Sequence, residues 1–508
     1  MNGLPIYLKL RPVAGGTKLV AAFTLALASA PLTDATLRPE VDKLVAAVSA
    51  ARHLPFHGAL PARALGLDEV RRATALAVGE GLDNPAARTE EQLLKRLGLL
   101  GAISAAHGSG DFAAAAYALA APPAARYDAA TGTLLVPNFL PVGSQRAALA
   151  HEIAHAVADQ RFGLRRFLRL APDRAPRLDG DAARARLALV EGDAVLAGLE
   201  LVDRRENFLG AHALHALVEQ LRAASREPSP EPSPDRVQDR VQDRAQDRFF
   251  DAAPSWFTRL GQFTHVDGLL FVARVRAHHP WSAVDALWGD PPVSSEQLLH
   301  PDKYEACEPA IAVEESALPS LAGFGRPVGS DVLGELVVRT WLESALPPEI
   351  AERAAAGWGG DRAGLYAPAP AESVTDGGTA AAPAPGAPLA WLTVWDDAAE
   401  ADDFARAARQ VLAKMSKETS QTRGDSQIAT DAAPTDERDV FATPRGSFAL
   451  GRKGDAVALL LAAPEPVAPA LAAMLDAAHP RASRRAAPRP RRAAQPGCPR
   501  RDRAAAPG

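Results

Sequence analysis

Three stretches of this 508-residue chain have no apolar pattern that a folded core could bury. Residues 226–248 combine a Pro-punctuated half with a repeated four-residue unit (DRVQ, DRVQ, DRAQ). Residues 367–388 are rich in Ala, Pro and Gly, and residues 479–508 consist largely of Arg, Ala and Pro. Because such segments bury too little apolar surface to offset the entropy lost on ordering, we expect two linkers and a disordered basic tail.

The rest of the chain therefore has to fold in parts that these stretches separate. We expect a core over residues 31–225, a helical region over 249–366 that packs on it, and a small α+β region over 389–478. The predicted fold is mainly α with minor β, in the α+β class.

The apolar pattern also locates the expected elements. Helices are predicted where apolar residues recur at three- and four-residue spacing, at Val41–Ala51, Leu67–Gly79, Glu90–Leu100, Ser144–Phe162, Asp181–Asp203, Glu400–Met415 and Ala468–Ala478. Strands are predicted in a hairpin over 125–136, whose second strand is 133–136, and at 389–395, 447–450 and 456–461.

Charge and cysteine content limit the classes of function. The 56 basic and 61 acidic residues give a net charge of −5, which lacks the basic footprint of a dedicated nucleic-acid binder. Two cysteines, Cys307 and Cys498, exclude a disulfide framework and a Cys-rich zinc ribbon. A bound metal would therefore need carboxylates and some of the 12 histidines as ligands.

One motif offers such ligands. His151-Glu152-Ile153-Ala154-His155 is an H-E-x-x-H sequence inside a predicted helix with few polar neighbours. Residues four apart lie on one helix face, so both imidazoles can reach one Zn²⁺. Glu152 lies beside them, where its carboxylate can accept a proton from water as general base.

A catalytic zinc site usually has a third protein ligand. Glu191, 36 residues beyond His155, is an acidic residue in an apolar predicted helix, where an unpaired carboxylate would be costly. Asp193 projects to another side of that helix and is the second choice of ligand or an outer-shell partner. Asp159, one turn after His155, could orient a ligand imidazole.

A metal-free arrangement is the alternative. In that case both histidines belong to a core helix, and Glu191 and Asp159 satisfy their ring nitrogens without a metal.

At these residues the chain resembles gluzincin-type metallopeptidases, which combine H-E-x-x-H with a downstream Glu. It is more closely similar to a family of uncharacterised bacterial proteins of predicted secreted zinc-protease character. The resemblance extends over roughly residues 40–415 and rests on these segments: Tyr127-Asp128, 131–136, 151–162, Glu191-Gly-Asp-Ala194, 294–304 and 357–362.

The resemblance implies a zincin-like catalytic core with an active-site helix and a glutamate helix. It also implies that the strand 133–136 is an edge that aligns a peptide substrate. The sequence departs from the family at 156–158, where Ala-Val-Ala stands in place of bulkier or polar residues. The motif residues His151, Glu152, His155 and Glu191 are intact.

Two further segments contain candidate functional residues. Ser294 and Ser295 before Glu296 predict a helix N-cap, and His300 and Tyr304 follow one turn apart. Either could donate a hydrogen bond to a transition-state oxyanion, although a packed His and Tyr is the more common outcome. Gly357–Arg362 lacks the Lys-Ser/Thr of a phosphate loop and predicts a tight turn with Trp358 packed on it.

The N-terminus has the order of a secretory signal over residues 1–30. Lys9, Arg11 and Lys18 precede an apolar stretch that ends with small residues at Ala28 and Ala30. This predicts export to the periplasm, cell surface or exterior, and a first buried helix of a cytoplasmic protein is the alternative. No run is apolar for long enough to predict a transmembrane segment.

The sequence thus predicts a zinc-dependent hydrolase of peptide bonds. Zn²⁺ would be held by His151, His155 and Glu191, Glu152 would act as general base, and a peptide or protein would be the substrate. The competing hypothesis is a binding or interaction protein on the same scaffold, without catalysis.

Overall fold

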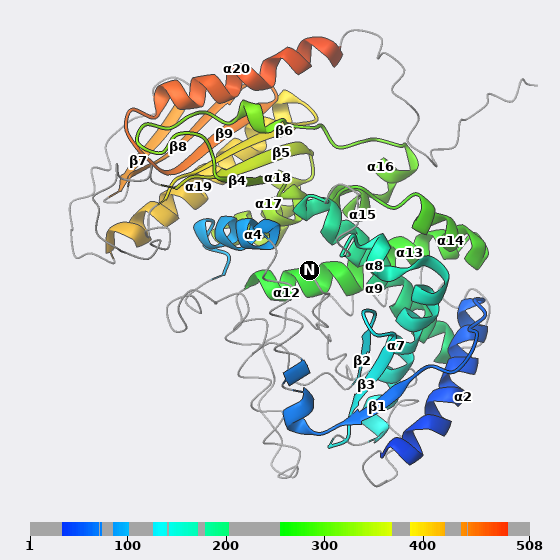
Figure 1. Ribbon diagram of the computed structural model, residues 1–508. Helices are drawn as coiled ribbons and strands as arrows, with labels where there is room; N and C mark the ends of the chain where they lie inside the picture. The colour runs from blue at the N-terminus through cyan, green and yellow to red at the C-terminus, as the bar shows by residue number, and fades with distance from the viewer. Residues whose placement is uncertain are drawn as a thin grey trace, which may run out of the picture.

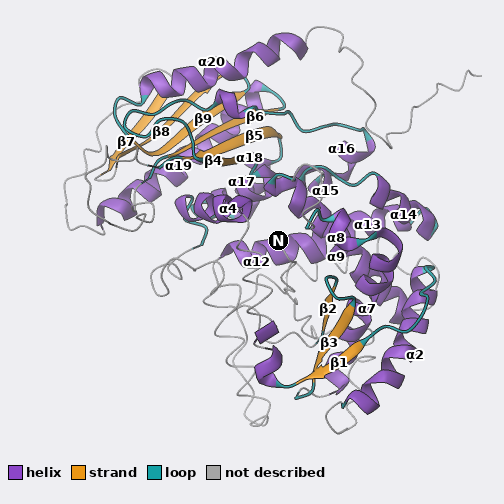
Figure 2. Cartoon of the chain, in the orientation of Figure 1, coloured by secondary structure: helices purple, strands orange, loops and turns teal. Residues whose placement is uncertain are grey.

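The computed structural model describes residues 33–70, 72–73, 85–100, 125–139, 142–170, 178–202, 255–367, 387–421, 438–443 and 446–485. The predictions of a signal peptide, of the 226–248 linker and of the last residues of the tail lie outside the described residues. So do residues 368–386 of the predicted 367–388 linker and most of the second half of the predicted helix Leu67–Gly79. The described chain is helix-rich with two sheets, which confirms the α+β class (Figures 1 and 2).

A three-stranded sheet belongs to the N-terminal part. Its order is β1-β3-β2, with β1 (Ala62–Leu65) parallel and β2 (Arg126–Asp128) antiparallel to β3 (Thr133–Pro137). The predicted hairpin is confirmed as β2 and β3, because the turn chemistry of Asp128–Gly132 joins them. The prediction that 133–136 is an edge strand is wrong, since β1 covers its other side.

Helices pack around this sheet and contact one another. α2 (Asp34–Arg52) and α7 (Val142–Phe162) pack together, and both contact α9 (Gly180–Val202). α9 in turn lies against a helical run made of α12 (Ser255–Gln262), the π-helical segment η2 (Phe263–Asp267) and α13 (Gly268–Arg276) (Figure 1).

A second, six-stranded antiparallel sheet has the order β4-β5-β6-β9-β8-β7. Its strands are β4 (Gly329–Asp331), β5 (Trp358–Leu365), β6 (Leu389–Trp395), β7 (Arg438–Thr443), β8 (Gly446–Lys453) and β9 (Ala456–Ala463). Trp391 and Trp395 of β6 join a core with Phe404 of α19 (Ala398–Gln421), and the alternate residue Leu392 joins one with Leu471 of α20 (Ala468–Arg485). Helices thus bury both faces of the sheet, which explains why β6 is apolar without alternation.

Strand β5 corrects two predictions. Gly357–Arg362 is not a tight turn, because residues 358–365 form a strand between β4 and β6. A Cβ on Gly360 would lie 2.0 Å from the Ile311 carbonyl oxygen, so the glycine lets a second backbone cross close to the strand. The six-stranded sheet therefore includes strands from before residue 367 as well as strands from after residue 388. The region 249–366, which was predicted to be helical, contributes β4 and β5 to it.

The remaining elements complete the described chain. They are α4 (Pro85–Arg96), α8 (Leu164–Phe167), α14 (Trp281–Gly289), α15 (Ser295–Leu299), α16 (Pro301–Glu305), the 3-10 turn η3 (Glu315–Ala317), α17 (Gly334–Glu343) and α18 (Pro348–Ala355). Strands β1, β4 and β7 were not predicted. α20 continues to Arg485, beyond the expected start of the tail at residue 479.

Candidate metal centre

The H-E-x-x-H motif lies on α7, as predicted. His151 and His155 are one turn apart, and their Nε2 atoms lie 3.0 Å from each other. The small residues at 156–158, where the sequence departs from the family it resembles, are all buried in the core around this helix.

Glu191 reaches the same point from α9. Its Oε2 lies 3.1 Å from His151 Nε2 and 3.3 Å from His155 Nε2, so the structure brings together the three predicted ligands. Burial alone would lower the pKa of His155, but the Glu191 carboxylate outweighs it and raises the pKa to about 9. Burial opposes ionisation of Glu191, yet the charges of His155 and His265 hold its pKa well below the usual range.

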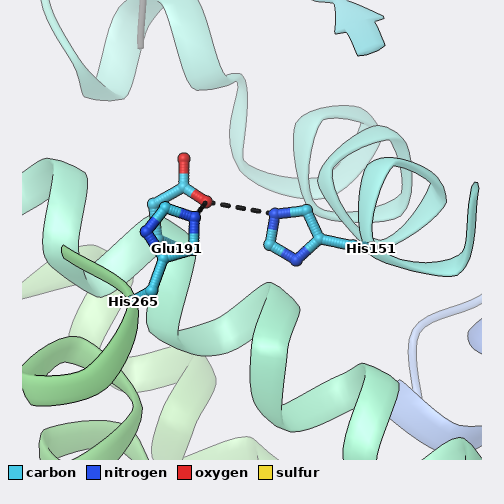
Figure 3. Close-up of side chains that lie close together, drawn as sticks. All are labelled: His151, Glu191 and His265. Carbon is cyan, nitrogen blue, oxygen red and sulfur yellow. Dashed lines mark hydrogen bonds and ion pairs between the residues drawn. The ribbon is translucent and has the colours of Figure 1, made fainter. Parts of the chain in front are cut away.

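His265 is a fourth member of the cluster that the sequence analysis missed. Its Nε2 lies 3.4 Å from Glu191 Oε2, and its ring stacks on that of His151 at 5.9 Å between centroids (Figure 3). It belongs to η2 and is separated from α9 in sequence by the 226–248 stretch. Burial lowers its pKa, against the opposing effect of Glu191. An isolated histidine in an apolar helical run gives no spacing signal that could have singled it out.

Two glycines allow this approach of helices. A Cβ on Gly192 would lie 2.2 Å from the Gly268 carbonyl oxygen, and one on Gly268 would lie 2.1 Å from the Ala188 carbonyl oxygen. α9 and the η2–α13 run are therefore in backbone contact, which places His265 beside Glu191.

Asp193 is used elsewhere. Its carboxylate accepts hydrogen bonds from Arg52 Nε at 2.6 Å and from the indole Nε1 of Trp288 at 2.9 Å. The structure therefore gives Asp193 the role of an anchor between α2, α9 and α14, not that of a metal ligand.

The general-base candidate Glu152 faces the cluster. Its carboxylate, His151 and His155 each offer one ligand atom within 4.8 Å of the others. Glu152 Oε2 accepts a hydrogen bond from the backbone N–H of Tyr127 on β2 at 2.6 Å, and the residue is buried. The Glu152 carboxylate is therefore adjacent to the cluster, and the hydrogen bond from the hairpin orients it.

Asp159 does not orient a ligand imidazole. Its Oδ2 accepts a hydrogen bond from the Tyr127 hydroxyl at 2.8 Å, and its Oδ1 accepts one from the Leu164 N–H at 2.6 Å. Asp159 therefore fixes the hairpin to the end of α7 and the start of α8, and the prediction that it contacts a ligand histidine is wrong.

His300 and Tyr304 also have other partners. His300 Nε2 lies 2.9 Å from Glu335 Oε1, and the Tyr304 hydroxyl donates to the Asp290 carbonyl oxygen at 2.7 Å. Neither belongs to the histidine–glutamate cluster. They do not share one helix either, because His300 separates α15 from α16; Ser294 caps α15 as predicted.

The donor set fits a small divalent transition metal. Imidazole nitrogens and carboxylate oxygens bind zinc at about 2.0–2.2 Å, so ligand atoms around a tetrahedral ion lie about 3.3–3.6 Å apart. The measured separations of 3.0, 3.1, 3.3 and 3.4 Å are close to that spacing. Imidazole with carboxylate suits several first-row divalent ions.

Comparison with known proteins finds a match in another part of the chain. Residues 322–473 match the family model of a domain of unknown function (DUF8575), which spans β4 to β9 and part of α20 and contains none of the cluster residues. No curated protein and no solved structure matches the chain. Within the described residues, no helix combines the length and apolar character needed to cross a membrane.

Proposed function

We propose that this chain is a zinc-dependent metallopeptidase. The observation that carries the proposal is the convergence of His151, His155 and Glu191 from two helices onto one point, with the Glu152 carboxylate beside it. In this view α7 is the active-site helix and α9 the glutamate helix of a zincin-like core.

The chemistry follows from the donor set. When bound, zinc supplies a Lewis acid that polarises the scissile carbonyl and makes water easier to deprotonate. Glu152 would accept the proton of the attacking water at its carboxylate as the new C–O bond forms. Glu152 would then pass that proton to the amine nitrogen as the C–N bond breaks.

The hairpin supports alignment of an extended substrate. Because β3 is central, β2 and β1 are the edges of the sheet among the described residues. The Tyr127 N–H on β2 points to Glu152 and so faces the cluster. We therefore propose that β2, not β3, is the strand beside which an extended substrate lies.

A second function has its own support. With His265 included, the protein offers four candidate ligands, which is the number of protein ligands in closed structural zinc sites. A metal-bearing interaction protein without catalysis is therefore the alternative, and fold alone does not choose between the two.

Substitution Glu152→Gln tests the proposal. Gln keeps the size of the side chain and an oxygen that can accept from the Tyr127 N–H, but it cannot act as a base. We expect about one zinc per chain in both proteins by elemental analysis. Cleavage of a peptide library should fall by about 10²–10⁴-fold in the variant.

The exposed Glu349→Gln on α18 is the control for removal of one carboxylate and should cleave like the wild type. Equal cleavage by wild type and Glu152→Gln would contradict the general-base role. Zinc binding without any cleavage by the wild type would favour the interaction protein.

A further inference from the structure

His265 lies beside Glu191, where it can supply a fourth ligand in addition to the three predicted ones, His151, His155 and Glu191. Glu191 Oε2 has three imidazole Nε2 atoms around it, those of His151 at 3.1 Å, His155 at 3.3 Å and His265 at 3.4 Å. Nearly equal distances from one carboxylate oxygen to three imidazole nitrogens are one requirement of a tetrahedral four-ligand set with Glu191 as a vertex.

The other ring nitrogen of His265 has the partners that a metal-binding histidine needs. Its Nδ1 lies 2.9 Å from Thr264 Oγ1 and 3.3 Å from the Gly261 carbonyl oxygen. An Nδ1–H that donates to a carbonyl oxygen leaves the Nε2 lone pair free to bind a metal. Such partners fix the tautomer and the ring orientation.

The backbone that carries His265 is unusual. η2 is the π-helical segment between α12 and α13, and within the described chain no other segment has this geometry. π-Helical turns inserted in α-helices are rare and occur frequently at functional sites. The close contact of Gly192 with Gly268 then holds this turn against α9.

We propose that His265 is a fourth protein ligand of the metal centre and closes it in the resting state. The inference rests on the proposed function, because a catalytic zinc site keeps its fourth position for water or substrate. Hydrolysis then requires His265 to withdraw from the centre, and η2 is the segment that would have to move.

X-ray absorption on the zinc-loaded full chain tests the ligand set without any substitution. We expect a fit with three imidazole nitrogens and one carboxylate oxygen. A fit with two imidazoles, together with oxygen ligands, would overturn the proposal.

The variant His265→Ala tests the consequence. Zinc binding, measured by competition with a chromophoric chelator, should weaken by more than about 100-fold, since loss of an outer-shell partner alone costs about 10–100-fold. At saturating zinc, the variant should cleave peptides faster than the wild type because its centre is open. His278→Ala, which removes an exposed imidazole shortly after α13, should change neither value.

The other outcomes separate the hypotheses. Unchanged zinc affinity in His265→Ala overturns the proposal, and if cleavage is also lost, His265 is a hydrogen-bond donor to the transition state. Weakened zinc affinity with no cleavage by any protein supports the fourth ligand and contradicts the peptidase. If His265→Ala does not fold, which circular dichroism would reveal, His265→Gln and the wild-type absorption data decide.

Discussion

At the scale of single residues, Arg52 and Asp193 hold the glutamate helix in place. Arg52 Nε and Nη2 donate to the two Asp193 oxygens at 2.6 and 2.9 Å, and the two side chains are only 1% and 3% exposed. The guanidinium also lies 4.1 Å from the Trp281 ring centroid and binds Asp285 at 2.7 Å. Since Asp193 is two residues after Glu191, this pair fixes the turn of α9 that carries the metal-ligand candidate.

Substitution Asp193→Asn should destabilise the protein while leaving the candidate metal ligands in place. It leaves the buried Arg52 charge with only the partly exposed Asp285 as an anionic partner. We expect a loss of about 3 kcal/mol in the free energy of unfolding, at the lower end of the range for a broken buried ion pair. Urea denaturation measures the loss, and zinc content should remain about one per chain.

The exposed pair of Arg146 with Glu40 is the matched control. Its side chains are 54% and 36% exposed, so Glu40→Gln should cost less than about 1 kcal/mol. Equal losses for the buried and the exposed pair would contradict the anchoring role of Asp193. If Asp193→Asn lost zinc but kept the free energy of unfolding of the wild type, Asp193 would have to be a metal ligand.

At the scale of elements, the crossing of α9 with the η2–α13 run decides which side chains meet. Gly192 and Gly268 are in contact at this crossing, and neither has room for a Cβ. Gly192, which follows Glu191, is needed because it lets the backbone of a second helix contact α9 next to the metal-ligand candidate. The motif alone does not show this requirement.

Substitution Gly268→Ala should separate the two helices. The added Cβ would lie 2.1 Å from the Ala188 carbonyl oxygen, which the backbone can relieve only by moving. We expect a destabilisation of about 1–3 kcal/mol, typical of overpacking, and weaker zinc binding because His265 moves with η2. Thermal unfolding and zinc titration are the measurements.

Gly198 on α9 provides the comparison. A Cβ there meets nothing within 4 Å, so Gly198→Ala should stabilise the helix by up to about 1 kcal/mol. If Gly268→Ala were as stable as Gly198→Ala, the close approach would not hold the centre together.

Helices and strands were predicted correctly where their apolar pattern depends on neighbours along the chain. The prediction failed where a segment distant in sequence packs against the element. The regular spacing around His151 and Glu191 is enough to predict α7 and α9, because helix faces depend on neighbours three and four residues away. The start of strand β5 was predicted as a turn because it is rich in glycine. The structure shows that Gly360 instead makes room for the backbone at Ile311, which lies far from it in sequence.

At the scale of the whole molecule, α9 joins the candidate metal centre to the six-stranded sheet. Arg184 of α9 binds Glu90 and donates to the Leu333 carbonyl oxygen at 2.7 Å. Asp181 accepts from the Ser295 N–H at 2.9 Å, and Asp331 of β4 accepts from the Gly180 N–H at 2.8 Å. The start of the glutamate helix is therefore tied by buried polar groups to α4, α15 and β4.

Asp181, at the start of α9, makes the stability of the fold depend on pH. Burial, opposed by Arg184 and by the hydrogen bond from Ser295, raises the pKa of Asp181 from 3.8 to about 7. The folded state therefore binds this proton more tightly than the unfolded state. Its contribution to stability is fully present below the unfolded pKa and is lost as pH rises through the folded pKa.

Substitution Asp181→Asn removes this titration. We expect the free energy of unfolding of the variant, relative to the wild type, to increase from about pH 4 to about pH 7 and to level off above that. Urea denaturation across this range measures the difference, and Asp42→Asn, which removes an exposed carboxylate on α2, controls for net charge. Parallel curves for Asp181→Asn and wild type would show that Asp181 does not titrate in the folded protein.

The sequence by itself determined the features that depend on near neighbours along the chain. The four-residue spacing of His151 and His155 puts both rings on one helix face, and Glu191 stands out as a carboxylate that an apolar helix must pair. The tertiary structure decided which groups meet across elements. It placed His265 beside Glu191, used Asp159 and Asp193 as structural anchors and made β3 a central strand. Such contacts depend on how helices and strands pack, which residue spacing does not encode.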